Sequence, residues 1–349
     1  MADGSGSLIS GLSYLAIGRE TTLGTYTTCT TALDFLSASL KTTQEAKILE
    51  QIQRKRTYSK HIRLMKVVDG EVEFYPVPRN TATGMFLQNA FGGTVTSATA
   101  TGETTGGLAF THTFELGSMD QSYPSLCINM RKGDSTNGFI YNYSGMRINE
   151  LNFTGELEEP LKCNVGLVGI DSTTLSNDVE SALTVSSADC LSFVEGRISI
   201  EPNFSSLTSS AYWEVQSMEF GLNNSLKSDN ESRRVGSDLL QVLPAGIQSH
   251  SLNLTMRFDD QSAYNAMIAN STMAAEIQFQ GDTITTSVIK EGIKFQFPKI
   301  FVMNAGDPEV SGPDNVLTAE VTFGVLRDDS SAGGYALQAL LTNDISSYA

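Results

Sequence analysis

The feature that most constrains the fold is a period-two alternation of apolar and polar residues. Leu252, Leu254 and Met256 alternate with polar residues, and similar sets begin at Leu161 and at Leu317. This pattern puts one face of a strand on a core and the other on water or a partner, as in antiparallel sheets. Further strands are predicted over 72–74, 148–153, 198–200, 213–222, 277–279 and 293–297. The chain is therefore predicted to be mainly β.

Two helices are indicated, and each directly follows a predicted strand. Asn80 and Thr81 provide an N-cap for a segment that ends at Gly92, a residue suited to the left-handed conformation of a helix C-terminus. Asp259 and Asp260 provide the cap for a second helix that runs to about residue 268. The same strand–helix order in both halves suggests an internal repeat.

The repeat is visible when the halves are aligned. Ser39-Leu40-Lys41 corresponds to Ser225-Leu226-Lys227, and Gly145 corresponds to Gly292 at the start of a later strand. The closing strands, 161–169 and 317–324, also agree. We therefore predict two tandem β domains, 1–171 and 191–349, joined by a polar linker over 172–190.

Charge and motifs argue against nucleic-acid binding and catalysis. The 23 Lys and Arg against 39 Asp and Glu give a net charge of −16, which suits repelling DNA rather than gripping its phosphates. The three histidines stand alone, and no metal, nucleotide or hydrolase motif accompanies them. The acidic loop 306–315 lacks the spacing of a calcium loop. We predict no enzyme activity, no cofactor and no metal site.

The amino-terminal residues have neither a basic segment nor an apolar run, so no secretory signal is predicted. No apolar stretch is long enough to span a bilayer, and membrane insertion is not expected. The four cysteines are scattered, without a paired motif, and are interpreted as buried thiols.

Two long excursions separate paired segments of the repeat. The first, 41–60, mixes apolar residues with a basic cluster, and its counterpart segment, 228–249, carries a pair of arginines and then a leucine-rich run. An apolar excursion is a contact arm in an assembly, whereas in a monomer it would be a lid or a short amphipathic helix packed on its own domain. The predicted inter-subunit contacts are Ile48, Leu49, Ile52, Arg54, Lys55, Arg56, Arg233, Arg234, Leu239, Leu240 and Leu243.

The order of these features resembles the tail tube proteins of long-tailed bacteriophages. The opening Gly18-Arg19-Glu20-Thr21-Thr22-Leu23-Gly24-Thr25 is similar to the start of that family. The Ser39-Leu40-Lys41 step, the strand and helix over 70–93, and the hairpin over 145–169 add to the likeness. A single tube domain would need about half of this chain, so the other half is interpreted as a second copy.

The resemblance implies tandem tail-tube-type β-sandwich domains, each with a flanking helix and a long inter-ring loop. Their sheet edges would pair around a ring, and rings would stack into a hollow tube in the virion tail, assembled in the host cytoplasm. Two domains per chain favour a trimeric, pseudo-hexameric ring. Three chains would carry a charge of −48, which suits an electronegative lumen through which phage DNA passes. The implied partners are the chain itself, a tape measure protein in the lumen, a tail terminator and distal tail or baseplate proteins.

Three alternatives stay open beside the major tube protein of a non-contractile tail. The inner tube of a contractile tail, a tailocin or a type VI secretion system shares the fold. A receptor- or carbohydrate-binding β-sandwich would be expected to show clustered aromatic residues, whereas Trp213 is the only tryptophan. An enzyme is the remaining class.

Overall fold

The fold is mainly β, as predicted. The computed structural model describes residues 10–348 except 53, 105–107, 119–122, 137, 175–177, 184–185, 187, 208–212, 258–264, 266–268, 286, 306–316 and 331–333. Its described part contains 18 strands and one α-helix, and every strand pair is antiparallel.

The strands fall into two sets along the chain. The first set is β1 (Tyr14–Arg19), β2 (Thr31–Leu33), β3 (Ser37–Ala38), β4 (Lys41–Ile48), β5 (His61–Phe74), β6 (Gly92–Thr99), β7 (Phe110–Leu116), β8 (Leu126–Lys132), β9 (Phe139–Glu156), β10 (Lys162–Gly169) and β11 (Asp171–Thr174). The second set is β12 (Gly196–Glu201), β13 (Val215–Asn223), β14 (Ser249–Arg257), β15 (Thr272–Thr283), β16 (Lys290–Ala305), β17 (Thr318–Val325) and β18 (Gln338–Asn343). Each predicted strand overlaps one of these strands, so the strand positions predicted from the alternation are confirmed.

The first predicted helix is confirmed as α1 (Thr81–Phe91). The Asn80 side-chain oxygen accepts a hydrogen bond from the Ala82 N–H at 2.9 Å, and Gly92 ends the helix with φ = 69°. The helix is buried against β9, β6, β7 and β2. The predicted second helix, 259–268, lies outside the described residues, apart from the helical Asn265.

The strand pairing of the first set recurs in the second. The neighbours β1–β8–β9–β10–β5–β3 correspond in order to β12–β15–β16–β17–β14–β13. Both β9 and β16 also have a register shift at the same place, after Ile148 and after Val302, opposite β10 and β17. A shared pairing order and a shared bulge support an internal duplication.

The two sets form one hydrogen-bonded network. Strand β9 pairs with β13, with Phe153 opposite Phe220, and β7 pairs with β18. The ring of Phe153 lies 4.9 Å from that of Phe295, centroid to centroid, within one buried core that draws on both halves. The division into 1–171 and 191–349 stays a prediction, and the start of the predicted linker forms β11, which pairs with β9.

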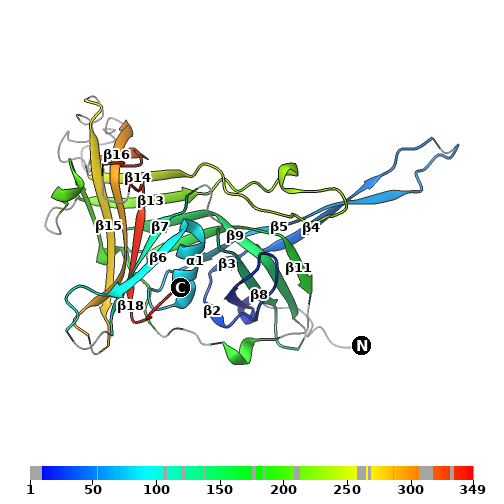
Figure 1. The fold of residues 1–349 in the computed structure, drawn as a ribbon, viewed down its shortest axis with the longest axis horizontal. Coiled ribbons are helices and arrows are strands. Elements are labelled where there is room, and N and C mark those ends of the chain that lie inside the picture. The colour runs from blue at the N-terminus through cyan, green and yellow to red at the C-terminus, as the bar shows by residue number, and fades with distance from the viewer. Residues whose placement is uncertain are drawn as a thin grey trace.

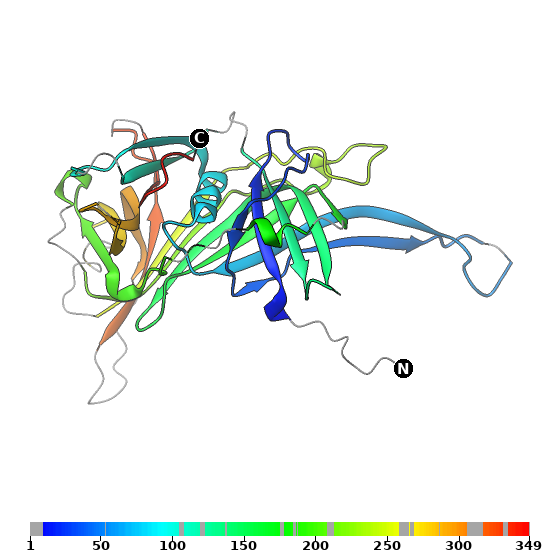
Figure 2. The same ribbon diagram turned by 90° about the horizontal axis from the view of Figure 1, so that it is seen from below.

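One hairpin departs from the body of the molecule. Figure 1 shows β4 and β5 extending together well beyond the packed sheets, and the turned view in Figure 2 shows the same projection. Near the base of the projection β5 pairs with β10, so the projection continues a central sheet.

Candidate assembly interface

The projecting hairpin is here called the arm, residues 41–66. Its strands β4 and β5 pair from Lys41 opposite Asp69 to Ile48 opposite His61. The side chains from Thr43 to Ile48 are exposed, so neither face of β4 is covered by the body there. The alternative of a short amphipathic helix is wrong for 41–48. An isolated two-stranded hairpin is marginal in water, which makes a partner for the arm expected.

The arm is basic in an acidic chain. It holds eight of the 23 Lys and Arg residues and only two acidic residues, Glu45 and Glu50, which leaves 15 basic and 37 acidic residues elsewhere. Its predicted contact residues Arg54, Lys55 and Arg56 are all exposed at the tip. The arm therefore carries charge opposite to that of the rest of the molecule.

Apolar side chains accompany that charge. Ile48 is 57% exposed and Ile52 is fully exposed, whereas Leu49 is half-buried and donates its backbone N–H to the Lys60 carbonyl at 2.9 Å. Unpartnered apolar residues on a projection are typical of a protein interface.

The counterpart segment, 228–249, folds back onto the base of the arm. The Asp238 carbonyl accepts a hydrogen bond from the Lys66 N–H at 2.9 Å, and its carboxylate accepts one from the Gln44 side chain at 3.1 Å. Arg233 donates to the Lys66 carbonyl at 3.2 Å, while Arg234 is exposed. The two predicted excursions thus meet, but only the first projects.

The leucines of the counterpart segment serve the chain's own core. Leu240 and Leu243 are buried in a small cluster with Ile170, and Leu239 is half-buried beside them. In the single chain their side chains are therefore not available to a neighbour. The exposed members of the predicted contact set lie on the arm and at Arg234.

A polar face covers the central sheet on the side away from the core. It consists of the outward residues of β5, β10, β9, β13, β14 and β17 and includes Glu71, Glu73, Glu150, Glu156, Glu219 and Glu320. The alternation predicted such a face, but assigning its residues required the strand register.

Asparagines on neighbouring strands hold three of these glutamates. Asn223 donates to Glu150 at 2.8 Å, Asn164 donates to Glu71 at 3.2 Å, and Asn253 donates to Glu219 at 3.4 Å. A neutral amide orients a carboxylate without cancelling its charge. The face is therefore ordered and stays negative.

The Glu20 carboxylate explains one residue of the opening motif. It accepts hydrogen bonds from the backbone N–H groups of Gly145 at 2.7 Å and Gly24 at 3.0 Å, and from the Ser125 hydroxyl at 2.8 Å. Burial raises the pKa of Glu20, and these hydrogen bonds oppose that rise. The motif thus joins the loop after β1 to β9.

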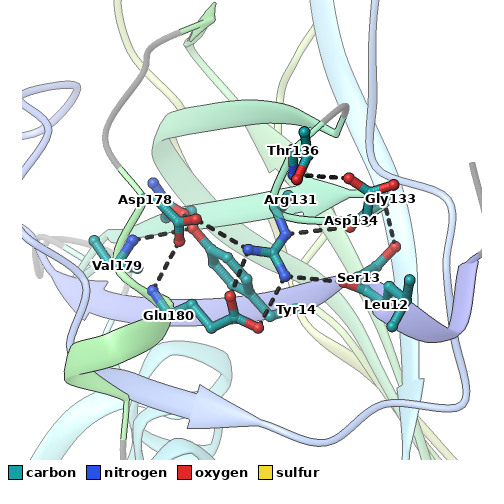
Figure 3. Close-up of polar contacts among 11 residues, drawn as sticks. Leu12, Ser13, Tyr14, Arg131, Gly133, Asp134, Thr136, Asp178, Val179 and Glu180 are labelled. Atoms are coloured by element: carbon teal, nitrogen blue, oxygen red, sulfur yellow. Dashed lines mark hydrogen bonds and ion pairs between the residues drawn. The ribbon is translucent and has the colours of Figure 1, made fainter.

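Figure 3 shows an ion cluster around the buried Arg131 of β8. The guanidinium, only 3% exposed, binds both carboxylate oxygens of Glu180 at 2.6 and 2.8 Å and also Asp178 at 3.0 Å. The pKa of Arg131 is raised, chiefly by the hydrogen bonds that its guanidinium donates to Glu180. It also donates to the Leu12 carbonyl at 3.1 Å and lies over the Tyr14 ring. This cluster fixes residues 178–180 against β1 and β8.

His112 and three of the four cysteines are packed inside the fold. His112 is buried and bonded to Ser97 and Asn343, and burial lowers its pKa. Cys29, Cys127 and Cys163 are buried and Cys190 is half-buried, largely as predicted.

In the described part of the chain no group of three His, Cys, Asp or Glu residues is placed to hold a metal ion. The acidic loop 306–315 lies wholly outside the described residues. No helix described here is long and apolar enough to cross a membrane.

These features define a class of protein: a β-rich chain with a projecting, exposed and basic arm. The model of the family described as phage tail tube protein matches residues 11–325, and the chain belongs to this family. It is therefore a component of a phage tail, and its family assembles into a tube with other tail proteins. No curated protein matches the chain.

Proposed function

We propose that the chain is the major tail tube protein of a long, non-contractile phage tail. In this proposal it forms trimeric, pseudo-hexameric rings that stack into a hollow tube and conduct the genome to the host. The observation that carries the proposal is the duplicated strand order within one chain, because two tube domains per chain need three chains for six positions.

The size of such a ring suits a conduit. Each chain offers eight strands to a continuous wall: β3 running into β4, then β5, β10, β9, β13, β14, β17 and β16. Three chains would supply about 24 strands. With a spacing of ~4.8 Å and a tilt of ~40°, the backbone circumference is roughly 150 Å and the diameter about 48 Å. This leaves room for a DNA double helix.

The polar face is the surface that we assign to the lumen. Its glutamates outnumber its basic residues, Lys162 and Arg257, and Arg257 is paired with Glu214. DNA affinity rises with each phosphate that a cation neutralises, so a wall of carboxylates and amides offers few holding points. This supports transient, non-specific passage of DNA rather than binding.

The arm is assigned to contact between rings, through Ile48, Ile52 and the basic cluster at its tip. Its positive charge complements the acidic remainder of a neighbouring copy. A tape measure protein in the lumen, a tail terminator and distal tail or baseplate proteins complete the proposed set of partners, and assembly is placed in the host cytoplasm.

Electron microscopy of the purified protein over a concentration series tests the proposal. We expect hollow tubes or short stacks of rings that lengthen with concentration. A compact monomer that stays monodisperse at the highest concentration, even when tail initiator proteins are added, would contradict it.

A further inference from the structure

Two strands, β9 and β13, join the two repeats of the chain. Among the described residues, the equivalent strand edges on the outer sides of the two repeats have no such partner. Within the chain, β9 pairs with β13 over seven residues, with Glu150 opposite Asn223 and Leu151 opposite Leu222. This joint links the sheet of the first repeat to that of the second. A ring built from such repeats needs the same joint again between chains.

The equivalent residues follow from the shared strand register. Met218 lies opposite Leu254, which is opposite Val321; Ala38 lies opposite Val72, which is opposite Val165. Position 218 of β13 is therefore equivalent to position 38, and by the same spacing 223 is equivalent to Thr43.

The other side of the joint is placed by the shared bulge. Glu150 follows the register shift of β9 and lies opposite Gly166, and Asn304 follows the register shift of β16 and lies opposite Thr322. Asn304 is thus equivalent to Glu150, and both side chains are exposed. Ala305, the next residue, is buried like Leu151, its equivalent.

Both equivalent edges are open in the described part of the chain. The residues Lys41 to Thr43 pair with β5 on one side only, whereas β13 is paired on both sides. On β16, pairing with β15 stops at Phe301, so the residues Val302–Ala305 have β17 on one side only. An open edge presents unpaired N–H and C=O groups to another strand.

A groove beside β3 marks the same place. It has a volume of about 860 Å³, and its lining includes Leu15 and Met130. These residues are in register with Tyr141 of β9. In the second repeat the equivalent residues of β12, β15 and β16 are Ile198, Ile277 and Phe295. The ring of Phe153 from β9 covers Phe295, with 4.9 Å between the ring centroids. The first repeat lacks such a cover from within the chain as far as it is described.

We infer that the open edge at the start of β4 in one copy pairs antiparallel with the end of β16 in a second copy, with Thr43 opposite Asn304. This rests on the proposed ring, and it adds the strands and register of its inter-chain joint. In a trimer, three such joints alternate with the three β9–β13 joints inside the chains, so all six are equivalent.

Cysteine cross-linking tests the register. Residues directly opposite each other in an antiparallel pair have Cα atoms about 4.5–5.5 Å apart, which is within the range for a disulfide. In a background with Cys190→Ser, the variant Thr43→Cys/Asn304→Cys is assembled and oxidised with copper phenanthroline and air. We expect covalent dimers and closed trimers on a denaturing gel without reductant.

Two matched variants serve as controls. Glu150→Cys/Asn223→Cys sits at the equivalent joint inside the chain and is expected to form a disulfide within one monomer. Lys47→Cys/Asn304→Cys displaces one thiol by four residues, roughly 13 Å along the strand. This variant is expected to assemble but to run as a single chain on the denaturing gel.

Rings of normal mass that give no cross-link at 43/304, while the internal control is oxidised, would overturn the inference and leave the proposed function standing. Equal cross-linking at 47/304 would overturn the register. Failure of every variant and of the parent to form rings would contradict the proposed function, and the inferred joint with it.

Discussion

Removing the two exposed isoleucines of the arm is predicted to stop tube elongation without unfolding the chain. Burying an isoleucine fully is worth about 1.5–3 kcal/mol. Ile52 is fully exposed and Ile48 is 57% exposed, so the proposed burial of both against the next ring would contribute about 3 kcal/mol per arm. Ile48→Ser/Ile52→Ser therefore weakens each arm contact roughly 100-fold.

The assay is the length distribution of tubes in negative-stain images, with thermal unfolding of the unassembled protein measured in parallel. Neither side chain is buried in the single chain, so the midpoint of unfolding is expected to stay unchanged. Val194→Ser/Val288→Ser removes two similarly exposed side chains from the body and is the matched control. Wild-type tube lengths in the arm variant would refute the role given to the arm.

Three further predictions concern the joint, the half-buried His250 and the polar face. Phe153→Ala removes a ring that is 1% exposed at the joint between the repeats. Denaturant titration should show a loss of about 3–5 kcal/mol in the free energy of unfolding, and a loss below about 1 kcal/mol would contradict a core shared by both repeats. Burial lowers the pKa of His250 from its ordinary 6.5 to about 4, so the unfolded chain takes up the proton first as the pH falls. The free energy of unfolding should therefore fall by about 3 kcal/mol between pH 6.5 and pH 4. His250→Gln should lose this part of the pH dependence, and an unchanged dependence of unfolding free energy on pH would refute the prediction. Glu150→Lys/Glu219→Lys should leave tubes intact but make them retain duplex DNA at low salt in a filter assay. Wild-type tubes should not retain the DNA, and equal retention by both proteins would contradict the assignment of the polar face to the lumen.

The sequence predicted those elements whose signal is local. Strands such as β10 and β14 bury every second residue, so their alternation reveals them. The first helix was placed by Asn80 and Gly92, whose side chain and backbone conformation act within a few residues. The opening motif with Glu20 was recognised, but two of the three hydrogen-bond donors to Glu20, Gly145 and Ser125, come from distant parts of the chain.

Other elements could not be predicted because their cause is not local. Strand β8 buries six consecutive residues between other layers, so it shows no alternation. Strand β4 is exposed along its length and carries no apolar period, which left a helix open as an alternative. Leu240 and Leu243 were assigned to a neighbour because nothing in the sequence shows that their segment folds back onto Ile170. The pairing of β9 with β13 also depends only on three-dimensional register.

Native mass spectrometry of the smallest ring tests the central claim most directly. Two tube repeats in a chain of 37.6 kDa predict a closed ring of three chains, about 113 kDa. A ring of six chains, or tubes that dissociate directly into monomers with no three-chain species, would contradict the account.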